Sequence, residues 1–124
     1  MRKGQKKIMV IDDNPDILLA LQAMLEDAGY NVEMSEQIQN LLLATRDTSD
    51  LPDILLLDML LSGQDGREIT KQLKSQDSTK RIPIILFSAY PNAEDDAHLA
   101  GANDFIAKPF DIGALLAKIE QYTS

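Results

Sequence analysis

Four short apolar runs, each closed by a polar residue, limit what this chain can fold into. They occupy residues 8–11, 54–57, 84–87 and 105–107. Each run is too short for a helix and shows no alternation, which is typical of parallel strands buried on both faces. A fifth segment, 31–35, alternates polar and apolar residues, so we expect it at a sheet edge. The sequence therefore predicts five parallel strands, four of them interior.

Helical periodicity fills the intervals between these runs. Apolar residues at positions 17, 21 and 25, and again at 112, 115, 116 and 119, indicate two amphipathic helices. Asn14 and Pro15 provide the cap and the first residue of the earlier helix, and Gly29 ends it. Weaker patterns predict helices at 38–45, 66–75 and 93–100. Strict alternation of strand and helix predicts a doubly wound α/β fold, with residues 1–124 forming a single domain and residues 1–6 loose.

Composition excludes several classes of function. The 124 residues include no Cys and one His, His98, which argues against thiolate metal sites, disulfides and a Ser/His/Asp triad. The net charge of -8 argues against direct binding to nucleic acid or to an anionic membrane. Asp58 interrupts the longest apolar stretch, which is far shorter than the roughly 18 residues of a membrane span. We find no export signal and expect a cytoplasmic protein.

A polar side chain follows each of the four runs. These residues are Asp12 and Asp13, then Asp58, Ser88 and Lys108. Because neighbouring parallel strands end at the same edge of a sheet, we expect the side chains to converge there. Three carboxylates about 4 Å apart repel one another by about 3–4 kcal/mol per pair at an effective dielectric near 20, so the pocket requires a cation. Ligands that are all oxygen favour Mg²⁺ or Mn²⁺ over zinc or copper.

Each of these residues also has a purely structural alternative. Asp12 and Asp13 are common turn residues, and a serine at a strand end often bonds a local backbone group. Lys108 precedes Pro109, a dipeptide that is typical of turns. A structural role fits Asp58 least well, because an unpaired carboxylate inside an apolar segment is costly.

Taken together, these motifs resemble the receiver domain of response regulators in two-component signalling, within the chemotaxis-regulator-like superfamily. The matching segments are Asp12-Asp13, residues 57–59, Asp65-Gly66, Ser88-Ala89 and residues 101–110. The resemblance extends over residues 7–122. It implies a flavodoxin-like three-layer sandwich with the sheet order 2-1-3-4-5 and a cis peptide bond before Pro109. The spacing from Ser88 to Lys108 is slightly shorter than is usual in the family, and the deficit falls near the predicted fourth helix.

The resemblance also implies a role for each site residue. Asp58 accepts the phosphoryl group, while Ser88 and Lys108 bind its oxygens. The implied ligands of Mg²⁺, for which Mn²⁺ can substitute, are Asp12, Asp13, Asp58 and the carbonyl of Leu60. Ser88 and Phe105 would form the conformational switch, with permanent core packing as the alternative role for Phe105. Tyr90, two residues beyond Ser88, is expected to shield the acyl phosphate from water.

The implied function is that of a signalling phosphoacceptor. Such a domain catalyses its own phosphorylation and dephosphorylation at Asp58 but turns over no separate substrate. Its partners would be a sensor histidine kinase or a phosphotransfer protein, and a downstream target or output domain. A homodimer through the face formed by the fourth and fifth helices is a further expectation.

Other interpretations of the sequence stay open. The chain is either a whole regulator or a receiver cut from a larger regulator or hybrid kinase. A Mg²⁺-dependent phosphohydrolase also forms an aspartyl phosphate, but Leu60 occupies the position of its usual second Asp. A flavin-binding domain is disfavoured because Asp12 and Asp13 would repel the flavin phosphate. A receiver-like module that binds without phosphorylation is disfavoured by the complete acidic set.

Overall fold

The computed structural model describes residues 6–35, 51–61, 63–90 and 92–123. A parallel sheet of five strands lies at the centre of this part of the chain. The strands are β1 (Lys7–Ile11), β2 (Asn31–Ser35), β3 (Ile54–Asp58), β6 (Ile84–Ser88) and β7 (Asp104–Ala107). Their spatial order is β2-β1-β3-β6-β7, which is the predicted order 2-1-3-4-5 when these strands alone are numbered. The predicted position of 31–35 at a sheet edge is confirmed.

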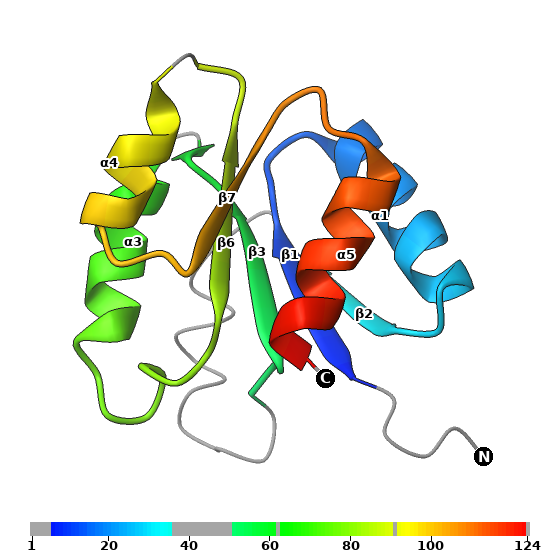
Figure 1. The fold of residues 1–124 in the computed structure, drawn as a ribbon, viewed down its shortest axis with the longest axis horizontal. Coiled ribbons are helices and arrows are strands. Elements are labelled where there is room, and N and C mark those ends of the chain that lie inside the picture. The colour runs from blue at the N-terminus through cyan, green and yellow to red at the C-terminus, as the bar shows by residue number, and fades with distance from the viewer. Residues whose placement is uncertain (1–5, 36–50, 62, 91, 124) are drawn as a thin grey trace.

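Helices cover both faces of the sheet. They are α1 (Pro15–Asp27), α3 (Gly66–Lys74), α4 (Ala93–Leu99) and α5 (Ile112–Thr123). Figure 1 shows α1 and α5 on one side and α3 and α4 on the other. The predicted three-layer sandwich is therefore confirmed. The helix predicted at 38–45 and residues 1–5 of the segment predicted to be loose lie outside the described residues.

The prediction that the last apolar run is an interior strand is wrong. β7 pairs with β6 and ends the sheet on the side opposite β2. Its edge position is hidden in the sequence because helices cover both of its faces. Phe105 belongs to the core beneath α4, and Ile106 belongs to the core beneath α5. An edge strand that is covered on both faces has the same apolar pattern as an interior strand.

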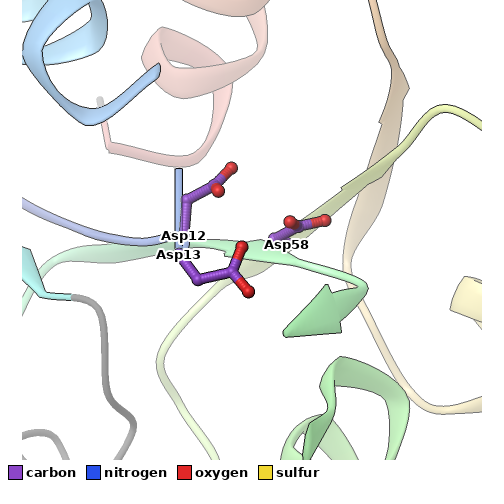
Figure 2. A group of neighbouring side chains, drawn as sticks. All are labelled: Asp12, Asp13 and Asp58. Carbon is purple, nitrogen blue, oxygen red and sulfur yellow. The ribbon is translucent and has the colours of Figure 1, made fainter. Parts of the chain in front are cut away.

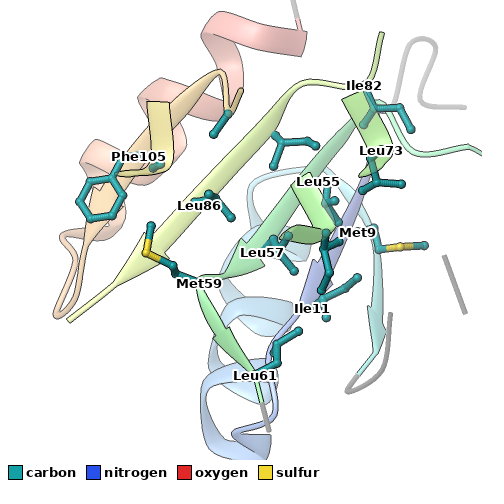
Figure 3. Close-up of a cluster of buried hydrophobic side chains, with 14 of the residues drawn as sticks. Met9, Ile11, Leu55, Leu57, Met59, Leu61, Leu73, Ile82, Leu86 and Phe105 are labelled. Carbon is teal, nitrogen blue, oxygen red and sulfur yellow. The ribbon is translucent and has the colours of Figure 1, made fainter. Parts of the chain in front are cut away.

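Side chains of the strands alternate between two cores. One core includes Met9, Ile11, Leu55, Leu57 and Leu86, which pack with residues of α3 and α4 (Figure 3). The other core includes Ile8, Val10, Leu56, Ile85 and Phe87, which pack with residues of α1 and α5. Burial on both faces fixes the strands firmly, so the residues at their carboxyl ends have well-defined positions.

Local signals set the boundaries of the first helix. The Asn14 side chain accepts hydrogen bonds from the backbone N–H groups of Asp16 at 2.9 Å and Ile17 at 3.4 Å, and Pro15 is the first helical residue. Gly29 follows the helix with a φ of 101°, a left-handed conformation that favours glycine. The predicted cap, start and end of this helix are all confirmed.

Two features near the sheet edge affect the site. A short antiparallel pair, β4 (Leu60–Leu61) and β5 (Gln64–Asp65), follows β3 and was not predicted. The Lys108–Pro109 peptide bond is cis, as the resemblance implied.

α4 has only seven residues, in keeping with the short spacing before Lys108. Among the described helices, none has the length and apolar character needed to cross a membrane.

Candidate functional site

The polar residues selected from the sequence meet at one edge of the sheet. Asp12 follows β1, Asp58 ends β3, Ser88 ends β6 and Lys108 follows β7. These four strands are consecutive neighbours in the sheet, so their carboxyl ends lie side by side. The predicted convergence of these residues is therefore confirmed.

Three carboxylates form the centre of the site. Asp12, Asp13 and Asp58 each offer an oxygen within 4.8 Å of the others, and Figure 2 shows these three side chains close together. Asp12 is fully buried, Asp58 is 8% exposed and Asp13 is half-buried. Buried carboxylates at this spacing require a cation, and a set of oxygen donors suits a hard divalent ion. The residues present therefore fit a magnesium site.

Lys108 supplies a positive charge to this cluster. Its Nζ lies 3.1 Å from Oδ2 of Asp12 and 3.4 Å from Oδ2 of Asp58. The other oxygen of Asp12 accepts a hydrogen bond of 2.8 Å from the backbone N–H of Asn14. Asp12 is thus held by one ammonium and one amide, and the ammonium bridges two of the three acidic residues.

The environment of Asp58 disfavours its charged form. Burial raises the pKa of the Asp58 carboxyl, and the nearby negative charge of Asp12 raises it further. Lys108 and the backbone N–H of Leu60, which lies 3.4 Å from Oδ1, act in the opposite direction without cancelling the shift. Ionised Asp58 therefore destabilises the folded protein at neutral pH unless further positive charge enters the pocket.

Ser88 is buried at the carboxyl end of β6. Its Oγ accepts a hydrogen bond of 3.0 Å from the backbone N–H of Tyr90, so the structural alternative for this serine is realised. Accepting that bond leaves the hydroxyl proton to be donated to another group. The carbonyl of Ser88 also accepts the backbone N–H of Lys108 at 2.8 Å, which ties the ends of β6 and β7 together.

Two residues predicted from the resemblance have defined positions but untested roles. The backbone N–H of Leu60 points to Asp58, while the metal-binding role of its carbonyl stays a prediction. Phe105 is buried in the core beneath α4, where Figure 3 shows its ring at the edge of the cluster. The switching role of Phe105 and its permanent packing in the core both stay predictions.

Sequence reasoning missed one contact of the site and two ion pairs near it. The Lys108 ammonium lies 4.8 Å from the centre of the Phe87 ring, and no sequence signal separates Phe87 from its apolar neighbours. The Arg67 guanidinium forms an ion pair with the Asp65 carboxylate at 2.7 Å and another with the carboxylate of Asp96, in α4, at 3.3 Å. Hydrogen bonding to Arg67 lowers the pKa of the Asp65 carboxyl. The available signal for the pair between Arg67 and Asp65 was a basic residue two positions after the Asp that caps α3.

Comparison with known proteins gives the same fold and a family. The response regulator receiver domain family matches residues 8–120. The chain is 32% identical over 116 residues to the DNA-binding dual master transcriptional regulator RpaA of Synechocystis, covering 91% of this chain and 47% of that protein. It is 31% identical over 115 residues to the protein PilH of Pseudomonas aeruginosa, covering 91% of this chain and 93% of PilH.

Solved structures agree with this result. A response regulator from Chloroflexus aurantiacus superposes with a TM-score of 0.87 at 30% identity, covering 96% of this chain and 98% of the other. The receiver domain of a sensor histidine kinase from Pseudomonas aeruginosa, solved with a magnesium ion coordinated in its active site cleft, has a TM-score of 0.81 at 28% identity, with 96% and 98% covered.

The relatives differ widely in total length, although the segments that match this chain are similar in length. The chain spans about half of RpaA, about a quarter of the response regulator PleD of Caulobacter vibrioides and nearly all of PilH. The shared segment is therefore the receiver unit, which occurs in these relatives with and without additional sequence. From the match over residues 8–120, together with the order of the strands, the chain belongs to the response regulator receiver domain family.

Proposed function

We propose that this chain is a signalling phosphoacceptor that receives a phosphoryl group on Asp58 from the phosphohistidine of a sensor histidine kinase or phosphotransfer protein. One observation carries the proposal. The Asp58 carboxylate shares a single pocket with two further carboxylates and the Lys108 ammonium. Such a grouping of opposite charges suits phosphoryl transfer, in which catalysis depends mainly on position and electrostatic stabilisation.

The transfer is a displacement at the phosphorus atom. An oxygen of Asp58 forms a bond to phosphorus while the bond from phosphorus to the histidine nitrogen breaks, and the imidazole keeps the electron pair and takes a proton. Lys108 donates hydrogen bonds to the oxygens of the transferred group, as does the Ser88 hydroxyl. The product is an acyl phosphate at Asp58. Movement of Ser88 toward that group, followed by Phe105, would then bias the surface around α4 toward its active form.

The acidic residues of the site would hold a divalent ion. Asp12, Asp13 and Asp58, with the carbonyl of Leu60, are the proposed ligands of Mg²⁺, or of Mn²⁺ in its place. When bound, the ion supplies positive charge that offsets the charge of the phosphoryl oxygens. The related kinase receiver with magnesium in its cleft supports this assignment.

Magnesium is expected to stabilise the protein. Because burial and Asp12 raise the pKa of Asp58, an added cation relieves a cost that is present at neutral pH and that disappears as the pH falls and Asp58 takes up a proton. In a thermal melt at pH 7, millimolar Mg²⁺ should raise the midpoint by about 3–5 °C, and the gain should shrink in acid. An equal gain with Na⁺ at matched ionic strength would count against a specific site.

An apolar cavity beside the site supports a protein partner. It has a volume of about 440 Å³ and lies between α1 and the residues that follow β6 and β7. Its lining consists of Ile17, Ala20, Leu21, Met24, Ala89, Lys108, Pro109 and Phe110. Because Lys108 belongs both to this cavity and to the acidic site, a partner side chain bound there would place its phosphohistidine next to Asp58.

The remaining partners are also proposals. We expect a downstream target or output domain, and a homodimer through the α4 and α5 face, where Leu99 of α4 is 82% exposed. The cytoplasmic location expected from the sequence also stays a prediction.

The proposal is tested with a small phosphodonor such as phosphoramidate, with Mg²⁺ or with a chelator. Intact mass should increase by one phosphoryl group when Mg²⁺ is present, and the adduct should be lost in base, as acyl phosphates are. Absence of an adduct at any donor concentration would contradict the proposal. Sustained release of phosphate from a phosphomonoester would instead favour a phosphohydrolase.

Tyr90 provides a separate prediction about the lifetime of the acyl phosphate. Its backbone N–H donates a hydrogen bond of 3.0 Å to the Ser88 hydroxyl, and the residue is 61% exposed. If the ring limits the access of water, Tyr90→Ala should hydrolyse its adduct faster by about threefold or more. The measurement is the decay of the adduct by intact mass after the donor is removed, with Tyr90→Phe as the matched control. Equal decay rates for Tyr90→Ala and the wild type would show that the ring offers no protection.

A further inference from the structure

Within the described residues, three groups lie close to the Lys108 ammonium, and one of them is aromatic. Two are the carboxylates of Asp12 and Asp58, at 3.1 Å and 3.4 Å. The third is the ring of Phe87, whose centre lies 4.8 Å from Nζ. The face of an aromatic ring carries partial negative charge and attracts a cation within about 6 Å of its centre.

Phe87 is itself held firmly. Its side chain is 2% exposed, and its ring makes an edge-to-face contact with Phe110 at 6.2 Å between centres. Its backbone pairs with Asp58 of β3, and its carbonyl accepts the N–H of Met59 at 2.9 Å. The ring is therefore a rigid surface attached to the strand next to the phosphoacceptor.

The ring adds to the two ion pairs as a restraint on the Lys108 side chain. Its backbone is fixed by the bond from its N–H to the Ser88 carbonyl, but its side chain has four rotatable carbon–carbon bonds. Only 19% of the side chain is exposed, so water does little to weaken the attraction between the ammonium and the ring. The ring limits the positions that the ammonium can take while it contacts both carboxylates.

We propose that Phe87 is a positioning residue for phosphoryl transfer, with its ring holding the Lys108 ammonium where the oxygens of the transferred group arrive. This inference rests on the proposed function and deepens it. An aliphatic side chain would fill the same core but could not attract the ammonium. The position before Ser88 therefore contributes to catalysis through Lys108 and without touching the phosphoryl group.

The test separates the charge on the ring from its packing. Phe87 is replaced by phenylalanine carrying one, two or three ring fluorines, which weaken the negative face while the shape is nearly kept. The maximal rate of Asp58 phosphorylation by phosphoramidate is measured at saturating Mg²⁺. We expect a stepwise fall that reaches about tenfold with three fluorines, while the Mg²⁺ concentration for half-maximal rate changes by less than about twofold.

A double-mutant cycle provides the matched control. In a Lys108→Ala background the fluorine series should have no effect on the remaining rate, because the cation has been removed. Contact between the ring and the ammonium is followed separately by NMR of the Lys108 Cε protons. The Phe87 ring should shift the signals of these protons upfield, and Phe87→Leu should remove that shift.

The outcomes distinguish this inference from the proposed function. If the wild type forms no adduct, the proposed function fails and the positioning role fails with it. If the wild type forms the adduct and its rate is the same across the fluorine series, the positioning role alone is overturned. Equal effects of fluorination with and without Lys108 would also overturn it, since they would indicate packing.

Discussion

Asp58→Asn is expected to form no phosphoryl adduct under conditions in which the wild type is fully modified. A carboxamide lacks the anionic oxygen that forms the acyl phosphate, so the loss should be complete rather than partial. The neighbouring Asp12 is unsuited to replace it, because Asp12 is fully buried whereas Asp58 keeps 8% of its surface exposed. Intact mass with phosphoramidate and Mg²⁺ provides the measurement.

Asp104→Asn is the matched control for this experiment. Asp104 is also a partly buried carboxylate that pairs with a lysine, Lys118, at 2.9 Å, but it begins β7 and so lies at the opposite edge of the sheet. This variant should accept the phosphoryl group as the wild type does. An adduct of unchanged yield on Asp58→Asn would show that another side chain is the acceptor.

Asp58→Asn should also make the protein more stable in the absence of Mg²⁺. The pKa of Asp58 is raised in the folded state, so its charged form lowers stability above that pKa, and the neutral amide removes this cost. At pH 7 we expect the melting midpoint of Asp58→Asn to exceed that of the wild type by a few degrees. The difference should vanish in acid, where Asp58 itself becomes neutral.

The strands and the site were predictable because their signals are local. Apolar runs closed by a polar residue indicate buried strands. Asn14-Pro15 favours the start of a helix whatever that helix packs against. The convergence of Asp12, Asp58 and Lys108 then follows from a single rule, that neighbouring parallel strands end at one edge. For this reason the convergence of these residues could be predicted without any knowledge of side-chain directions.

The features that escaped prediction depend on contacts between distant segments. β7 was judged interior because burial of Phe105 and Ile106 by helices looks the same as burial by further strands. Phe87 has the sequence pattern of any core residue, and only the path of the chain after β7 brings Lys108 over its ring. Contacts of this kind arise from tertiary structure, which residue spacing does not encode.

Gly66 belongs to a motif that carries the family resemblance, but helix propensity alone conceals its importance. It is the first residue of α3, where helix propensity alone favours alanine over glycine by about 1 kcal/mol. In the folded protein a Cβ at this position would lie 2.5 Å from the carbonyl oxygen of Asp58 and 2.8 Å from Cα of Met59. Both contacts are with backbone atoms, and the N–H of Gly66 bonds the Met59 carbonyl at 2.7 Å, so neither side can move away easily.

Gly66→Ala is therefore expected to destabilise the protein strongly, against its helix propensity. Overpacking against backbone should reduce the free energy of unfolding by about 3 kcal/mol and the melting midpoint by about 10 °C. Gly113→Ala is the matched control, since Gly113 also lies in the first turn of a helix and its added Cβ would meet a side-chain atom rather than backbone, Oδ2 of Asp111 at 3.1 Å. That variant should melt within a few degrees of the wild type.

Because the displaced atoms include the backbone of Asp58, Gly66→Ala should also phosphorylate more slowly below its melting range. Unchanged stability of Gly66→Ala would show that α3 can move away from the site.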